Sequence, residues 1–162
     1  MCPRNYLKYD SIGDVWWQKA WNGGKEDYGY GIAVDLTDNI YVTGSSWNGT
    51  DSDYRTVNYN SSGDIVWQKK WDSGKNDGSD GIAVDSMGNV YVTGTTYNGV
   101  NYDYLTIKYD SSGNIVWQKV WDSGRDDKGR DIAVDSSGNV YVTGCSYNGA
   151  NEDYLTIKYR QY

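Results

Sequence analysis

The stretch "DSSGNVYVTG" at residues 135–144 joins a polar pentad to a short run of β-branched and aromatic residues. Asp135 can accept a hydrogen bond from the backbone two residues on, and Gly138 supplies the left-handed backbone that closes a hairpin. The run Val-Tyr-Val-Thr is typical of a β-strand. A calcium loop of the EF-hand type would need further ligands after the glycine, ending in Glu. The stretch therefore predicts a turn between two strands.

The pentad recurs with a period of 25 residues, inside a longer period of 50 that has no insertion. "WQK" starts at 17, 67 and 117, "IAVD" at 32, 82 and 132, and "YVTG" at 41, 91 and 141. Asp38 alone replaces the fourth-position glycine, and Asp tolerates left-handed backbone better than most residues. The pentads are "DSIGD" at 10, "DLTDN" at 35, "NSSGD" at 60, "DSMGN" at 85 and "DSSGN" at 110 and 135. Each 50-residue repeat is therefore predicted to contain two β-hairpins.

The runs between the turns have the length and alternation of short strands. In the third repeat they cover 115–121, 132–135, 140–144 and 154–159, and the first of them alternates with a period of two. Both of its faces are largely apolar, which suits a sheet covered on each side by a neighbouring sheet. A repeat of about 50 residues with four antiparallel strands is typical of a β-propeller blade.

We therefore expect an all-β fold, a β-propeller of four-stranded antiparallel blades. The short Ala- and Val-containing strand is expected to lie nearest the axis, and the strand with paired Trp, such as Trp67 and Trp71, outermost. A β-solenoid with 25-residue rungs or a β-sandwich remains as an alternative. Solenoid strands are parallel, however, and would not need a tight hairpin turn at every rung.

Two stretches carry a resemblance to a known family. "DIAVDSSGNVYVTG" at 131–144 and "DYLTIKYDSSGNIVWQKVW" at 103–121 resemble the SBBP β-propeller repeat, and are similar to the NHL-type blade, which has the same first turn. The resemblance spans essentially the whole chain. It implies a propeller fold and a cell-surface or secreted location, and it brings no catalytic residues.

The repeats do not amount to a full ring. They cover about 1–50, 51–100 and 101–150, followed by a closing strand at 151–160, and residues 1–10 duplicate that strand. Three blades cannot close a ring without extreme twist, and an open stack leaves apolar faces wet. We expect a homodimer in which two chains form one six-bladed ring, the last three strands of each completed by the N-terminal Trp-bearing strand of the other. The alternative is a fragment of a longer propeller that forms higher oligomers.

The composition excludes several functions. A net charge of −7 without any basic run argues against nucleic-acid binding. No apolar stretch approaches the ~20 residues that span a bilayer, and the start of this chain has no signal-peptide core. The absence of His excludes histidine acid–base chemistry and Ser-His-Asp triads. Paired carboxylates remain, but nearly every acid recurs at a turn position, so we expect no enzyme, no catalytic residue and no cofactor.

Two cysteines bear on the closure of the ring. Cys145 follows the second strand of the third repeat, and Cys2 precedes the N-terminal copy of the third strand. If that copy lies beside the last second strand, the two sulfur atoms would be within reach of a disulfide. The alternative, which we favour, is that Cys145 simply replaces Ser45 and Thr95 while Cys2 lies in the terminus.

Two kinds of loop offer polar groups to a ligand. An aromatic residue, an Asn and an Asp recur between the second and third strands, a set that suits a sugar ring and its hydroxyl groups. The alternative is that Asn-Gly makes a tight turn and the aromatic side chain packs on the next blade. The candidate residues are Trp47, Asn48, Asp53, Tyr97, Asn98, Asp103, Tyr147, Asn148 and Asp153.

The loops between blades keep an acid next to a cation. Asp27, Asp77 and Asp127 each lie two residues after Lys or Arg, and calcium is conceivable because oxygen ligands are plentiful. We favour capping of loop amides or local pairing, and predict no metal site. The sequence thus predicts a non-enzymatic interaction or structural scaffold that dimerises, with a protein or glycan as possible ligand. The alternative function is a carbohydrate-binding propeller.

Overall fold

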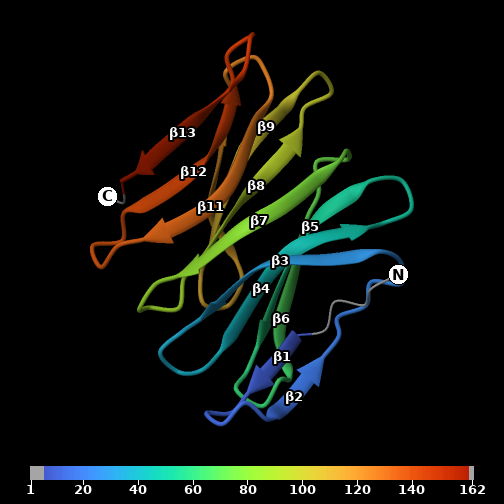
Figure 1. Cartoon of the computed structure of the whole chain (residues 1–162), viewed down its shortest axis with the longest axis vertical. Helices are drawn as coiled ribbons and strands as arrows, with labels where there is room; N and C mark the ends of the chain where they lie inside the picture. The colour runs from blue at the N-terminus through green and yellow to red at the C-terminus, as the bar shows by residue number, and fades with distance from the viewer. Residues whose placement is uncertain (1–5, 161–162) are drawn as a thin grey trace.

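The computed structural model describes residues 6–160, which form thirteen strands in four antiparallel sheets (Figure 1). The sheets have two, four, four and three strands. They are β1–β2, β3–β6, β7–β10 and β11–β13. The bounds are β1 Tyr6–Tyr9, β2 Val15–Lys19, β3 Asp27–Val34, β4 Ile40–Trp47, β5 Ser52–Tyr59, β6 Ile65–Trp71, β7 Asp77–Val84, β8 Val90–Tyr97, β9 Tyr102–Tyr109, β10 Ile115–Trp121, β11 Asp127–Val134, β12 Val140–Tyr147 and β13 Glu152–Tyr159.

The sheets follow one another as successive blades, in the strand order that the repeats predict. In the middle of the molecule β7 contacts both β3 and β11, the first strands of the sheets on either side of it, and the rest of each sheet fans outward (Figure 1). β7 also contacts β4 and β5 of the sheet before it, and β11 contacts β8 and β9. The four-stranded antiparallel sheets are confirmed, whereas the six-bladed ring of two chains is not tested by a single chain.

Each pentad forms the predicted turn. In 135–139 the Asp135 carboxylate accepts hydrogen bonds from the backbone N–H groups of Ser137 and Asn139, both at 2.9 Å, and Gly138 has a φ of 80°. Tyr141, two residues into the next strand, donates its hydroxyl to the same carboxylate at 3.0 Å. Asp38 adopts a φ of 63° in place of glycine. The pentad is thus a turn that is tied to the strand after it.

The first strand of each blade is longer than its sequence suggests. It was expected at 132–135, but β11 begins at Asp127, and β3 and β7 begin equally early. The added residues at the start of β11 also pair with β12, but a β-bulge between Gly129 and Asp131 shifts their register relative to the rest of the strand. This close approach requires the glycine of "YVTG", because a Cβ on Gly144 would overlap the carbonyl oxygen of Lys128. Half of the expected interblade loop is therefore part of the sheet.

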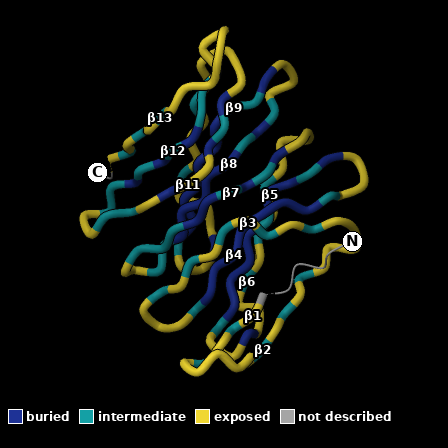
Figure 2. Tube along the Cα trace, in the orientation of Figure 1, coloured by how far each residue is buried: buried dark blue, intermediate teal, exposed yellow. Residues whose placement is uncertain are grey.

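Tryptophans on the outer strands fasten each sheet to the next. The indole N–H of Trp67 donates to the carbonyl of Ser111 at 3.1 Å, and that of Trp71 to Oε1 of Gln118 at 2.8 Å. Trp17 and Trp21 make the equivalent bonds to the first four-stranded sheet. The buried core accordingly lies between the sheets, around β4, β5, β7, β8 and β9 (Figure 2).

The other face of the outer strand is less covered than its apolar pattern suggests. Ile115, Val116 and Val120 of β10 are about half exposed. The gap between neighbouring sheets widens away from the axis, so an outermost strand cannot be covered fully on both faces.

The Asp35 turn predicts an acid-sensitive contribution to stability. Partial burial alone would raise its pKa, but hydrogen bonds from Asn39 and Thr37 hold the pKa at about 2, below the usual 3.8. Since the folded pKa lies below the unfolded one, the contribution is present above about pH 4 and is lost as the pH falls toward 2. We expect Asp35→Asn to reduce this loss by on the order of 1 kcal/mol, measured by urea unfolding across that range. An unchanged pH dependence in the variant would contradict the account.

Candidate functional site

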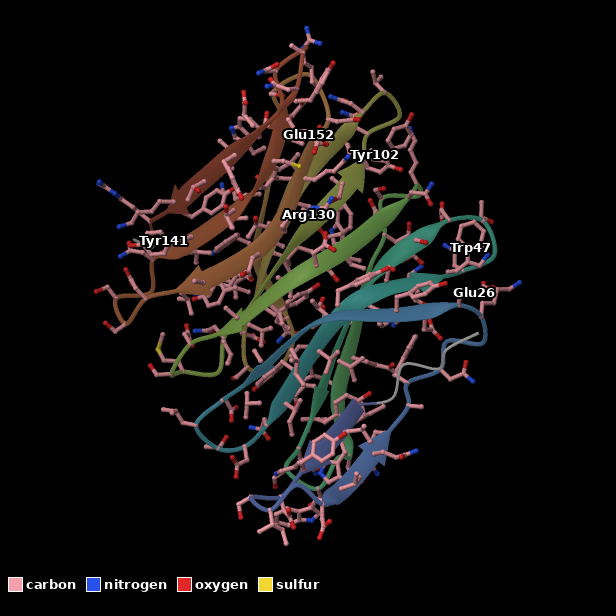
Figure 3. The ribbon with its side chains drawn as sticks, viewed as in Figure 1. Glu26, Trp47, Tyr102, Arg130, Tyr141 and Glu152 are labelled. Carbon is pink, nitrogen blue, oxygen red and sulfur yellow. The ribbon has the colours of Figure 1, made fainter. Side chains whose placement is uncertain are left out.

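The aromatic-Asn-Gly loops lie at the ends of β4, β8 and β12. The backbone N–H of Trp47 donates to the carbonyl of Glu26 at 2.9 Å, so the loop within a blade is joined to the loop that precedes the blade (Figure 3). Tyr97 and Tyr147 make the same bond, to Asn76 and Asp126. The structure therefore places the three predicted sets at equivalent positions on successive blades, not in one common site.

The Asn and Asp side chains of these loops bind one another. In the second four-stranded sheet, the Asn98 amide donates to Asn101 at 2.6 Å and to Asp103 at 2.9 Å, and its oxygen accepts from the backbone of Val100 and Asn101. Gly99 follows with a φ of 107°. Asn48 and Asn148 repeat this pattern, including the bonds to Asp53 and Asp153. The hydrogen-bonding capacity of the amides is thus used to form the turn.

The aromatic side chains pack within their own loops. The rings of Tyr97 and Tyr102 are 5.0 Å apart, and the Lys75 ammonium lies 5.9 Å from the Tyr97 ring centroid. The Arg125 guanidinium lies 6.0 Å from that of Tyr147. Packing of these rings on the next blade, the alternative interpretation, stays a prediction. Carbohydrate binding by these loops stays a prediction, and it would have to rely on the aromatic faces and not on the amides.

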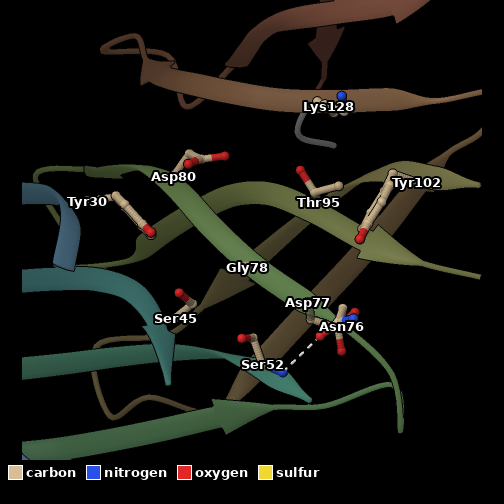
Figure 4. Close-up of a pocket in the computed structure, with 10 residues that line it drawn as sticks. All are labelled: Tyr30, Ser45, Ser52, Asn76, Asp77, Gly78, Asp80, Thr95, Tyr102 and Lys128. Atoms are coloured by element: carbon tan, nitrogen blue, oxygen red, sulfur yellow. Dashed lines mark hydrogen bonds between the residues drawn. The ribbon is translucent and has the colours of Figure 1, made fainter. Parts of the chain in front are cut away.

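An open cleft lies where the first strands of the blades converge (Figure 4). Tyr30, Asp80 and Lys128 line it from three successive sheets. Asn76 lies at its edge and accepts a hydrogen bond from the backbone of Ser52 at 3.2 Å. None of the nine residues predicted to contact a sugar lines this cleft. It is a surface that the sequence alone did not indicate, because it draws on residues about 50 positions apart.

The interblade acids cap loop amides, as the sequence favoured. The Asp127 carboxylate accepts the backbone N–H of Ser123 at 2.8 Å and its hydroxyl at 3.1 Å. Asp77 does the same with Ser73, and Asp27 accepts from the backbone of Gly23. Burial raises the pKa of Asp77 despite these bonds.

Two acidic clusters arise where these loops meet the third strand of a blade. One carboxylate oxygen from each of Asp103, Asp122 and Asp127 lies within 4.8 Å of the others. A second cluster, one repeat earlier, joins Asp53 and Asp72 with Asp51, whose counterpart in the next repeat is Asn101. Burial, together with the charges of Asp122 and Asp127, raises the pKa of Asp103 to about 6. The sequence analysis missed these clusters because Asp72 and Asp122 follow the outer strand and are distant in sequence from Asp53 and Asp103.

The two ends of the stack leave apolar side chains exposed. Ile32 on β3 is 60% exposed, whereas the equivalent Ile82 and Ile132 are 8% and 7% exposed. Tyr154 on β13 is 96% exposed, whereas its equivalents Tyr54 and Tyr104 are completely buried. β3 has no complete sheet before it in the described chain, and β13 has none after it.

Comparison with known proteins agrees with this repeat architecture. The sequence matches the SBBP family, described as a beta-propeller repeat, over residues 13–50, 72–100 and 122–149. The chain belongs to the SBBP beta-propeller repeat family. The resemblance to the SBBP repeat that the sequence indicates is thereby confirmed, and the three matched regions fall on the three repeats.

A solved structure shares the fold of this SBBP chain. It is a protein of unknown function from Bacteroides caccae, with a TM-score of 0.57 at 11% sequence identity. The match covers 94% of this chain and 54% of that one, so the SBBP chain spans about half the length of its neighbour. No curated protein matches the sequence.

Two further expectations concern single residues and the bilayer. Cys145 is a free, partly buried thiol, and Cys2 lies outside the described residues, so the Cys2–Cys145 disulfide stays a prediction. Within residues 6–160 there is no helix with the length and apolar character needed to cross a bilayer.

Removing the loop amide should destabilise the blade. Asn98→Ala removes the one hydrogen-bond donor to the buried Asp103 carboxylate found among residues 6–160, so we expect a loss of about 1–3 kcal/mol in the free energy of unfolding. Val100→Ala, in the same loop at an 86% exposed position, is the matched control and should change stability by less than about 0.5 kcal/mol. Thermal and urea unfolding measure both. Equal stability of the two variants would contradict the turn-forming role of Asn98.

Proposed function

We propose that this protein is a non-enzymatic propeller scaffold whose two chains close into one six-bladed ring. The observation that carries the proposal is the contrast between one exposed tyrosine and its two buried equivalents. An exposed apolar sheet face of this kind calls for a partner, and a second copy of the chain offers a matching face.

The repeated tyrosine joins neighbouring blades by a specific contact. The Tyr54 hydroxyl donates to the carbonyl of Leu105 in the next sheet at 3.2 Å, and Tyr104 donates to the carbonyl of Leu155 at 3.3 Å. Each hydroxyl lies against a glycine of that sheet. A Cβ would come within 2.8 Å of it at Gly94 and within 2.6 Å at Gly144. Tyr154 continues this series but has no following sheet in its own chain.

The first four-stranded sheet presents the matching acceptor. Gly44 pairs with Arg55 across β4 and β5, as Gly94 pairs with Leu105 and Gly144 with Leu155. Within the described chain no tyrosine hydroxyl comes closer than 2.9 Å to the Cβ position of Gly44. We therefore place the Tyr154 hydroxyl of one chain against Gly44 of the other, donating to the carbonyl of Arg55.

The inner strands of neighbouring sheets approach closely at a repeated glycine, whose equivalent on β11 is Asp131. Gly31 on β3 approaches the backbone of Asp80 on β7, and Gly81 on β7 approaches that of Asp131 on β11. In a two-chain ring, β11 of one chain would meet β3 of the other and cover Ile32. Closure at both junctions then buries the two faces that a single chain leaves exposed.

The third strand of the repeat occurs at both ends of the chain, as β1 and β13, and only one of these two strands can complete the blade at the junction between chains. Each chain has thirteen strands where half of a ring of six four-stranded blades needs twelve, so either β1 or β13 is left over. The tyrosine position of the N-terminal copy is Arg4, which lacks the anchor. We infer that β13 pairs with β2 of the other chain and that β1 is displaced from it.

The mass in solution tests this proposal. We expect light scattering to give twice the 18.3 kDa of one chain. Tyr154→Glu places a charge against the receiving sheet and should give a monomer, because an unpaired buried charge is costly. The matched control is Leu36→Glu, at an exposed apolar residue in a turn that should remain dimeric. A monomeric wild-type protein would contradict closure by a second copy.

A further inference from the structure

A corner between the second four-stranded sheet and the three-stranded sheet brings three carboxylates together. Asp103 lies on β9, Asp122 directly after β10, and Asp127 at the start of β11, which contacts β9. One oxygen of each lies within 4.8 Å of the others. The site belongs to a single chain, so it does not depend on closure of the ring.

The cluster is buried at its base and incompletely satisfied. Asp103 is 3% exposed, and only one of its oxygens accepts a protein hydrogen bond, from Asn98 at 2.9 Å. Its Oδ1 is buried and has no protein donor. Asp127 is fully buried, and its bonds from Ser123 leave carboxylate lone pairs unused. Buried anions without a compensating charge are rare, so this arrangement calls for a cation.

No protein cation supplies that charge. None of the ion pairs formed by residues 6–160 involves Asp103, Asp122 or Asp127. Asn98 forms a neutral hydrogen bond, and the Arg125 guanidinium of the same loop lies over the ring of Tyr147.

The preceding repeat shows how the same corner is neutralised by a side chain. There the Lys70 ammonium lies 2.7 Å from Asp72 and 3.5 Å from Asp53. The position equivalent to Lys70 is Val120, which is 54% exposed. The two corners differ in two features: the first has the Lys70 ammonium and a further carboxylate, Asp51, where the second has Val120 and Asn101.

We propose that Asp103, Asp122 and Asp127 bind a calcium ion that takes the place of the missing ammonium. Carboxylate oxygens are the ligands that Ca²⁺ prefers, and its flexible coordination tolerates an irregular protein set. Zinc is disfavoured because the corner offers neither His nor Cys. Asp122 and Val120 are exposed, so water can reach the ion and complete its coordination.

Calcium titration of the full chain tests the proposal. We expect calorimetry to give one Ca²⁺ per chain with a dissociation constant of about 1 mM or tighter. Excess CaCl₂ should raise the melting temperature by roughly 5 °C relative to EDTA, because the ion binds only the folded state. The response to Mg²⁺ should be much smaller.

Exchanging the two corner residues supplies the decisive variants. Val120→Lys should lose the calcium response, since the new ammonium occupies the site, and Lys70→Val should raise the stoichiometry from one ion to two. Val116→Lys adds the same charge at an equally exposed valine of β10 and should respond as the wild type does. No calcium-dependent shift in the wild type, or an undiminished one in Val120→Lys, would overturn the proposal. An equal response to Mg²⁺ would overturn the assignment to calcium.

Discussion

The structure depends on the burial of each sheet against the next. A blade of this sequence is apolar on faces that only a neighbouring blade can cover, and the contact is made specific by a tyrosine hydroxyl set against a glycine. Tyr54 against Gly94, and Tyr104 against Gly144, fix the distance and register between sheets. The outer tryptophans add a second attachment further from the axis. The two four-stranded sheets are joined by both attachments, and the exposed Tyr154 marks an end sheet whose tyrosine contact is unmade within the described chain.

Much of the fold could be predicted from the sequence because the turns are local. An Asp that accepts amide bonds from its own turn, followed three residues later by a glycine, requires no distant partner, so six pentads were enough to place the hairpins. The start of the first strand could not be placed this way. "DYGY" at residues 27–30 resembles a loop, and it becomes strand only because Gly44 permits a close approach of the neighbouring chain segment.

The candidate sites were less predictable, for a related reason. The residues that all repeats share include the aromatic-Asn-Gly loops, which the sequence therefore predicts as ligand sites, but the polar groups of these loops bond to one another and form the turn. The two proposals rest instead on residues that differ between equivalent positions of the repeats. Tyr154 is exposed whereas its equivalents are buried, and Val120 occupies the position that Lys70 occupies one repeat earlier. Neither difference has meaning until the structure shows which residues meet across a blade junction.

Closure by a second copy is the central claim, and the free edge of β13 tests it most directly. Half of the backbone amides of β13 bond to β12, and the others face the edge where β2 of the second chain is expected. Hydrogen exchange resolved by residue should show these edge amides protected as strongly as those of β9 that face β10. Rapid exchange along the edge of β13 at all protein concentrations would contradict the account.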